Sequence, residues 1–392
     1  MSVGAPARPG LRRSLPSRFG DRDGLVRRID WVLVLAVVAL SMIGAILVWS
    51  ATRSKLAAAG LAPNGYLTKD MLNIGIGMVV AGATTMFDYR VLRAYAMILY
   101  GLSILGLLAV LSPLGVTING AHSWIALPAG FSVQPAEFAK LGLVLGLGML
   151  LAEKRDTDLT PRGVDIVQSL ALALVPIGLI LLQPDLGEAL IILALLFGVI
   201  AVAGTPARWL VGLLGGGILV AVAVVQLGIL KSYQLARLTS FLHPGANPTG
   251  TGYNTQQARI TIGSGGLLGT GLFHGPQTQG GFVPFQQTDF IFTVAGEELG
   301  FVGSAVIILL IGIILWRGVR IATRSTDMFG RLLAVGIVCW LTFEAFENIG
   351  MTLGIMPVTG VPLPFVSYGG SAMLVDMVAI GLLLNVRRRS GP

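Results

Sequence analysis

Cysteine is almost absent from this sequence, since Cys339 is the only one in 392 residues. A single cysteine forms no intrachain disulfide and anchors no cysteine-rich metal site. Histidine is scarce as well: His122, His243 and His274 lie far apart in the sequence, which gives a three-histidine metal site little support. Charged residues make up 12% of the chain, against about a quarter in soluble domains, so an ordinary soluble fold is excluded.

Several enzyme motifs are also missing. The sequence has no phosphate-binding loop, no serine nucleophile elbow and no HExxH pair. The glycine-rich stretch 263–266 follows no strand pattern and precedes no lysine-bearing helix, so it is a weak nucleotide motif. The net charge of +8 would suggest nucleic acid as the partner of a soluble protein. Here the distribution of the charge indicates a membrane instead, and no nucleic-acid partner is expected.

Apolar segments fill most of the chain. Hydrophobic residues make up 54% of it, and the mean hydropathy is +0.81. The segments are each about long enough to cross a hydrocarbon core of about 30 Å. They predict an all-α polytopic membrane protein with about ten transmembrane helices, at residues 30–50, 71–88, 92–112, 134–152, 166–182, 187–203, 208–230, 290–315, 332–354 and 368–386. The predicted organisation is a basic tail (1–28), a ten-span domain (29–386) and a basic C-terminus (387–392).

Lysine and arginine predict the topology. Twenty of the 27 lie in the two termini and in alternate loops, against six in the remaining loops. Because cytoplasmic loops are enriched in these residues, both termini are expected in the cytoplasm. The long loop 231–288 is then outside, as are 51–70, 113–133 and 355–367.

The first 28 residues contain seven arginines and few large apolar side chains. This composition predicts a disordered cytoplasmic tail with affinity for anionic lipid, or alternatively for a protein partner. No small-residue cleavage site marks a signal peptide, and the first apolar run is expected to be a retained anchor.

A polar, glycine-rich stretch at residues 252–300 interrupts the apolar pattern, and the chain re-enters an apolar segment at Asp289. Irregular polar backbone is tolerated beside a bilayer only in water or around a cavity. A carboxylate at the mouth of such a helix is a candidate for chemistry. The alternative is that Asp289 only caps the helix.

Charged residues also lie inside the predicted spans. Glu137 and Lys140 are three residues apart, hence on one helix face, and predict either a structural ion pair or the wall of a polar cavity. Asp185 is either a helix cap or, with Glu188, an acidic edge open to water. Three further acids extend the set: Glu297 and Glu298, expected to face a cavity and a polar helix neighbour, and Glu344, expected to pair inside the bundle.

Two outer loops carry further candidates. Trp124 follows Asn-Gly and is either an interfacial anchor or a contact for a sugar or lipid headgroup. The last outer loop, 357–371, has three prolines and three glycines and includes Ser367 and Ser371. It is either a rigid turn or part of the same cavity as Asp289.

These motifs together resemble the SEDS family (shape, elongation, division and sporulation) from about residue 30 to 386. The resemblance is closer to its RodA branch than to the division branch, FtsW. It rests on NGAHSW (119–124), QPAEFAK (134–140), QPDLG (183–187), GYNTQQ and IGSGGLLGTG (252–271), TDFIF and GEELG (288–300), and NIGM with PVTGVPLPFVSYGGS (348–371).

The resemblance implies a ten-helix peptidoglycan glycosyltransferase of the cytoplasmic membrane. Such an enzyme polymerises lipid II into β-1,4-linked glycan at the outer face and works with a class B penicillin-binding protein. Asp289 matches the family's essential acid. Two departures are His122, where relatives often have Lys or Arg, and Gln287, where His commonly precedes Thr-Asp. The substrate-binding candidates are Trp124, Glu137, Lys140, Asp185, Gln256, Gln257, Arg259, Glu297, Ser367 and Ser371.

The implied reaction inverts the donor sugar in one displacement. Asp289, expected to be ionised at neutral pH, would take the proton of the acceptor hydroxyl. Lys140 and Arg259, with a divalent cation such as Mg or Mn as an option, would neutralise the departing pyrophosphate. Two rival readings stay open: a transporter that flips lipid-linked precursor, and a scaffold without activity. Gly336, Gly350 and Gly381 are expected to permit close approach of the partner's helix.

Overall fold

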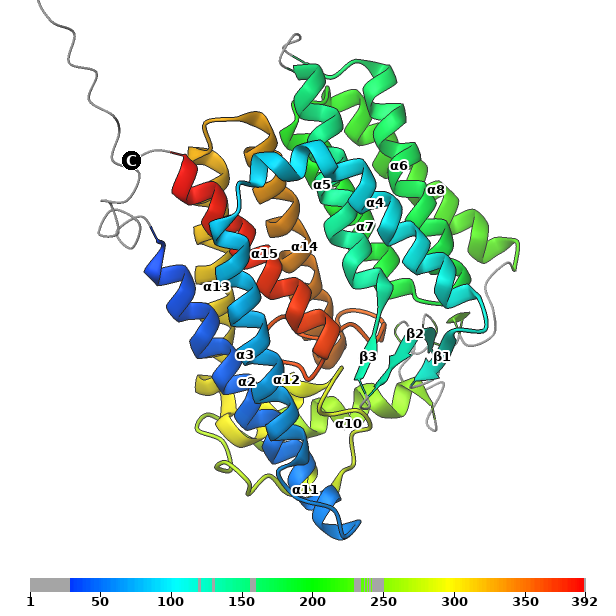
Figure 1. The fold of residues 1–392 in the computed structure, drawn as a ribbon. Coiled ribbons are helices and arrows are strands. Elements are labelled where there is room, and N and C mark those ends of the chain that lie inside the picture. The colour runs from blue at the N-terminus through cyan, green and yellow to red at the C-terminus, as the bar shows by residue number, and fades with distance from the viewer. Residues whose placement is uncertain are drawn as a thin grey trace, which may run out of the picture.

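The protein is a bundle of long helices with a small sheet at one end (Figure 1). The computed structural model describes residues 29–118, 121–128, 131–155, 160–228, 234, 235, 237, 239, 241 and 250–390. The predicted tail (1–28), the Asn119-Gly120 turn and much of the loop 231–249 fall outside these residues.

Each of the ten predicted apolar segments coincides with a helix. Eight helices of the described chain are long and apolar enough to cross a membrane, with α12, η3 and α13 counted as one. The two that miss this measure are α3 and the 17-residue α7, so a count of ten spans stays a prediction. The helices are α2 (Trp31–Ala58), α3 (Gly65–Met86), α4 (Tyr89–Leu111), α5 (Pro135–Arg155), α6 (Gly163–Leu182), α7 (Leu186–Val202), α8 (Ala207–Gln226), α10 (Thr251–Ser264), α11 (Pro276–Gly280), α12 (Ile291–Val294), η3 (Ala295–Leu299), α13 (Gly300–Arg324), α14 (Met328–Leu353) and α15 (Gly370–Arg389).

The structure departs from the prediction in two loops, and the first departure corrects the all-α fold class. Residues 115–133 form a three-stranded antiparallel sheet of β1 (Gly115–Ile118), β2 (Ala121–Leu127) and β3 (Phe131–Val133). β-branched and aromatic residues in these short stretches favour strands. The loop 231–288 is also partly helical, because it contains α10 and α11.

The predicted span 290–315 is a broken helix rather than a continuous one. A single π-helical turn, η3, joins α12 to α13, and Gly300 follows it with φ +67°. Carbonyl groups that such a turn releases need new donors. The glycine-rich loop supplies them: Thr270 N–H donates to Glu297 O at 2.9 Å and Gly271 N–H to Glu298 O at 3.1 Å.

Glycine is required where that loop meets the broken helix. A Cβ added to Gly265 would lie 2.0 Å from Gly296 O, and one added to Gly269 would lie 2.2 Å from Glu298 O. Both distances are too short for any side chain. Backbone-to-backbone packing therefore explains Gly265 and Gly269 within the sequence IGSGGLLGTG.

The two ends of the described chain lie at the same end of the bundle, opposite α10, α11 and the sheet (Figure 1). Asp30 caps α2 by accepting a hydrogen bond from Leu33 N–H at 3.2 Å, and its carboxylate also pairs with Arg317 of α13. Arg389 at the end of α15 pairs with Asp88 at 2.9 Å. This arrangement is the one expected if both termini lie on one side of the membrane.

The glycines predicted to receive a partner's helix are instead used inside this chain. A Cβ at Gly336 would meet Val144 at 2.8 Å, and one at Gly381 would meet Ala81 O at 2.6 Å. A Cβ at Gly350 would lie 2.7 Å from Met356. These positions let the chain's own helices and loops pack, so the prediction that they form the partner interface is wrong.

Candidate functional site

Asp289 lies in a turn just before α12, and side chains from two other segments hold the backbone of this turn. Asn348 on α14 donates Nδ2–H to Asp289 O at 2.9 Å and to Val361 O at 2.7 Å. Ser367 Oγ donates to Thr288 O at 2.5 Å. The turn is therefore fixed to the proline-rich loop 357–371, for which the sequence left open a rigid turn or a part in the same cavity as Asp289.

That loop approaches the Asp289 carboxylate closely. Gly360 has φ +84°, and a Cβ there would lie 3.3 Å from Asp289 Oδ2. A left-handed backbone and a near contact both favour glycine at this position. Ser367 also accepts a hydrogen bond from Leu363 N–H at 2.8 Å, so its hydroxyl is engaged in shaping the loop.

Helix capping does not explain Asp289. The N-cap of α12 is Phe290, which makes no side-chain cap hydrogen bond, and Asp289 precedes it. Asp289 is partly accessible to solvent at the N-terminal end of the broken helix. The alternative that Asp289 merely caps this helix therefore loses its structural basis.

Burial raises the pKa of Asp289 to about 7, and the negative charge of Asp185 acts in the same direction. A hydrogen bond from Thr288 and the positive charge of Arg237 oppose this rise. A carboxyl with this pKa is partly protonated at neutral pH, in contrast to the expectation of an ionised base. A pKa near the working pH is well suited to a general base.

Of the two roles that the sequence allowed for Asp185, the structure shows the helix cap, whereas Glu188 is 2% exposed and pairs with Lys140 instead of forming an acidic edge open to water. Asp185 Oδ1 accepts a hydrogen bond from Glu188 N–H at 3.2 Å and so caps α7, while Oδ2 accepts one from Gln134 Nε2 at 3.1 Å. Gln134 N–H in turn donates to Ser371 Oγ at 3.3 Å. Burial raises the pKa of Asp185 as well. The helix starts of α5, α7 and α15 are thus joined beside Asp289.

A buried charge cluster lies deeper in the bundle. Lys140 Nζ is 2.7 Å from Glu137, 3.5 Å from Glu188 and 3.4 Å from Glu344, and these side chains are at most 2% exposed. Trp340 donates Nε1–H to Glu344 at 2.5 Å and lies 5.1 Å from Nζ. The sequence predicted the Glu137–Lys140 pair and an internal role for Glu344. It missed that α7 and α14 meet α5 here.

This surrounding changes the role expected for Lys140. Its ammonium group already faces three carboxylates and is fully buried. Such a group does not reach a departing pyrophosphate, so that part of the prediction is wrong. Lys140 instead balances the charge of buried acids, any of which would be costly alone.

Arg237, in the long loop 231–288, was not among the candidates that the sequence predicted. Its Nη1 donates to Thr359 O at 3.3 Å, and its charge acts on both Asp289 and Asp185. Arg237 and Arg259 line one small pocket with Met356 and Pro357. The sequence signal that could have identified Arg237 was its position, because basic residues are rare in the loops predicted to lie outside.

The remaining candidates are placed as follows. On α10, Gln256 is exposed and Gln257 is half-buried. Trp124 is half-buried on β2, opposite Val116 of β1, and no described contact joins it to the Asp289 turn. His122 lies on the same strand and its Nδ1 is 3.1 Å from Thr117 Oγ1. Their part in substrate binding stays a prediction.

Glu297 and Glu298 hold the outer loop to the broken helix. Glu297 accepts hydrogen bonds from Gln277 N–H at 2.8 Å and Thr278 N–H at 2.7 Å, at the start of α11. Glu298 accepts one from Ser50 of α2 at 2.6 Å. The Glu297 carboxylate is fully buried, and its hydrogen bonds to the start of α11 give it a structural role.

The described residues do not fit a resident divalent cation. Within the ranges that the structure describes, no group of three His, Cys, Asp or Glu side chains is arranged to hold a metal. Asp289 and Asp185 are two acids, and the positive charge of Arg237 acts on both.

Known proteins of similar sequence share nearly the whole chain. A protein-family model described as "Cell cycle protein", covering FtsW, RodA and SpoVE, matches residues 30–391. A probable peptidoglycan glycosyltransferase FtsW from Trichlorobacter lovleyi is 38% identical over 359 residues, which cover 91% of this chain and 92% of the relative.

Solved structures support the same relationship. A chain of a peptidoglycan synthase complex that coordinates polymerization and crosslinking is 35% identical, with a TM-score of 0.75 over 92% of this chain and 98% of that one. The rod shape determining protein RodA of Thermus thermophilus is 32% identical, with a TM-score of 0.67 over 92% and 97% of the two chains. The chain therefore belongs to the FtsW/RodA/SpoVE family of membrane proteins.

Proposed function

We propose that the protein is a peptidoglycan glycosyltransferase that polymerises lipid II into β-1,4-linked glycan. The family match supports this activity, since a relative 38% identical carries that enzyme name. The observation that carries the proposal is the Asp289 turn, which Asn348 and Ser367 fix in place and where the carboxyl has a pKa of about 7. A rigid carboxyl with this pKa is suited to repeated proton transfer.

Asp289 accepts the proton in the proposed reaction. The 4-hydroxyl oxygen of the acceptor sugar attacks the anomeric carbon of the donor as its proton passes to the Asp289 carboxylate. The bond to the polyprenyl pyrophosphate breaks on the opposite face, so the α-linked donor gives a β-linked product. No covalent enzyme intermediate forms.

Arg237 and Arg259 stabilise the departing pyrophosphate. They line one pocket beside the proline-rich loop, and the charge of Arg237 acts on Asp289. Guanidinium groups bind phosphate oxygens with two parallel hydrogen bonds. This assignment replaces Lys140, which three carboxylates surround.

The proposed location is the cytoplasmic membrane, with both termini inside and the Asp289 turn facing outside. Twenty lysine and arginine residues lie in the termini and in the loops assigned to the cytoplasm, against six in the loops assigned to the outside, and this asymmetry supports the topology. In a Cys339→Ala background, a cysteine at position 250 is expected to react with an impermeant reagent added from outside. Reaction only from the cytoplasmic side would reverse the topology.

The proposed partner is a class B penicillin-binding protein that cross-links the glycan. The similarity to a chain of a synthase complex that couples polymerization to crosslinking supports a pairing of this kind. The role in elongation rests on the motifs that resemble the RodA branch. Relatives carry both FtsW and RodA names, so complementation of elongation-defective and division-defective cells decides between the branches.

The deciding experiment is polymerisation of labelled lipid II by the purified protein, with and without its partner. Glycan chains made by wild type but not by Asp289→Asn support the proposal. Movement of lipid II across vesicle membranes without glycan synthesis would instead identify a flippase. Full complementation of cells by an inactive variant would identify a scaffold.

A further inference from the structure

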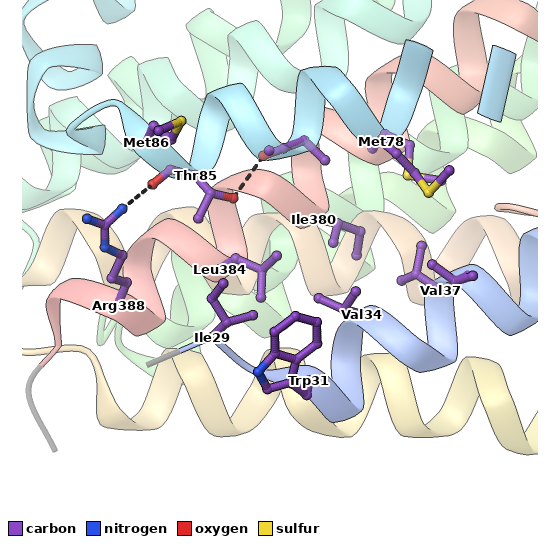
Figure 2. Close-up of a pocket in the computed structure, with 14 residues that line it drawn as sticks. Ile29, Trp31, Val34, Val37, Met78, Thr85, Met86, Ile380, Leu384 and Arg388 are labelled. Carbon is purple, nitrogen blue, oxygen red and sulfur yellow. Dashed lines mark hydrogen bonds between the residues drawn. The ribbon is translucent and has the colours of Figure 1, made fainter. Parts of the chain in front are cut away.

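A groove at the end of the bundle that carries the two ends of the described chain plays no part in the proposed reaction. Residues of α2, α3 and α15 enclose a cavity of about 400 Å³ there. Figure 2 shows Arg388 at one end of this groove, Met78 and Val37 at the other, and Val34 and Ile380 between them. The groove is almost entirely apolar, with a cation at its mouth.

Arg388 has hydrogen-bonding capacity to spare. Its Nη1 donates to Thr85 O at 3.3 Å, as Figure 2 shows, and a guanidinium group has five N–H donors. In the part of the chain that the structure describes, no carboxylate lies within ion-pair distance of it, whereas Arg389 beside it pairs with Asp88 at 2.9 Å. Arg388 therefore presents an uncompensated positive charge where the apolar groove ends.

We propose that this groove binds one phospholipid with an anionic headgroup, with an acyl chain between α2, α3 and α15 and the phosphate on Arg388. Arginine binds phosphate through paired hydrogen bonds, and basic pockets between transmembrane helices hold anionic lipid headgroups. Trp31 lines the groove and is half exposed, as is common for tryptophan at the membrane interface.

The site is separate from the proposed reaction. It lies at the opposite end of the bundle from the Asp289 turn (Figure 1), and under the proposed topology it faces the cytoplasmic leaflet. Lipid binding depends on the membrane-spanning bundle and not on the glycosyltransferase assignment. A negative result for lipid binding therefore does not argue against the glycosyltransferase activity, and the reverse also holds.

Native mass spectrometry of the full-length, delipidated protein tests the site. With equal amounts of phosphatidylglycerol and phosphatidylcholine, one phosphatidylglycerol per protein is expected to survive preferentially. Arg388→Gln should reduce that preference about fivefold, the factor expected for one basic residue near an anionic surface. Arg324→Gln is the matched control, because Arg324 is an exposed arginine of α13 that does not line the groove.

A second pair of variants tests the apolar part. Gly82 lines the groove and has no atom within 4 Å of an added Cβ, so Gly82→Leu should fill the groove without disturbing the backbone. Gly75 on the same helix is equally open but outside the groove. The site is supported if Gly82→Leu loses the bound lipid and Gly75→Leu keeps it, while both variants unfold at the same temperature. The proposal would be overturned if both variants of a matched pair changed lipid retention equally, or if the wild type showed no preference for phosphatidylglycerol. Displacement of the bound lipid by polyprenyl phosphate would overturn it as well.

Discussion

Replacing Asp289 with asparagine separates catalysis from folding. Asn keeps the size of the side chain and leaves the backbone hydrogen bond from Asn348 to residue 289 intact. It cannot accept a proton in the physiological range. Loss of a positioned general base lowers turnover by about 100-fold to 10,000-fold, so the variant should make almost no glycan.

The same variant should gain stability above neutral pH. Because burial raises the carboxyl pKa from 3.8 to about 7, the folded state holds the proton more tightly than the unfolded state. Wild-type stability therefore falls as pH rises from about 4 through 7, by up to about 4 kcal/mol at 1.36 kcal/mol per pKa unit. Water at the partly accessible carboxyl reduces that figure. Asp289→Asn carries no such penalty and should unfold at a higher temperature than wild type at pH 8, but not at pH 4.

The assay is gel-resolved polymerisation of labelled lipid II by the protein with its partner, combined with thermal unfolding at both pH values. Wild-type kcat/KM should rise with pH through a midpoint near 7. Asp88→Asn is the control, because Asp88 caps α4 through Arg90 N–H at the other end of the bundle. Near-normal polymerisation by folded Asp289→Asn, or a wild-type rate that is flat between pH 6 and 8, would refute the reasoning.

Five further variants test the surrounding structure. Lys140→Gln should cost about 3–5 kcal/mol, because it leaves buried carboxylates without their cation. The double variant with Glu137→Gln should recover only part of the lost stability, as measured by thermal unfolding. Full recovery of both stability and activity would show that Glu137 and Lys140 are not part of the site. Glu297→Gln should loosen the outer loop, since it weakens charge-assisted hydrogen bonds worth about 1.5–3 kcal/mol each, and faster proteolysis of the loop is the measurement. Arg237→Gln and Arg259→Gln should each lower kcat by about tenfold or more with folding unchanged, and an effect on KM alone would exclude pyrophosphate stabilisation.

Local sequence determined the helices. Apolar runs long enough to cross a bilayer specify them by length and composition alone. Their ends follow from short-range signals, such as Asp327 accepting a hydrogen bond from Gly330 N–H at the start of α14 and Gly354, with φ +76°, at its end. The Asp289 motif was visible because a single acid followed a polar, glycine-rich stretch. These features depend on residues within a few positions of one another.

The tertiary structure decided which of these residues meet. Glu188 and Glu344 are 48 and 204 positions from Lys140, and only helix packing brings them to its ammonium group. Arg237 reaches the Asp289 site because the outer loop folds back onto Thr359. The raised pKa of Asp289 depends on burial, which no local pattern reports. The π-helical turn at Ala295–Leu299 likewise exists because the loop from residue 265 supplies donors and space to a backbone distant in sequence.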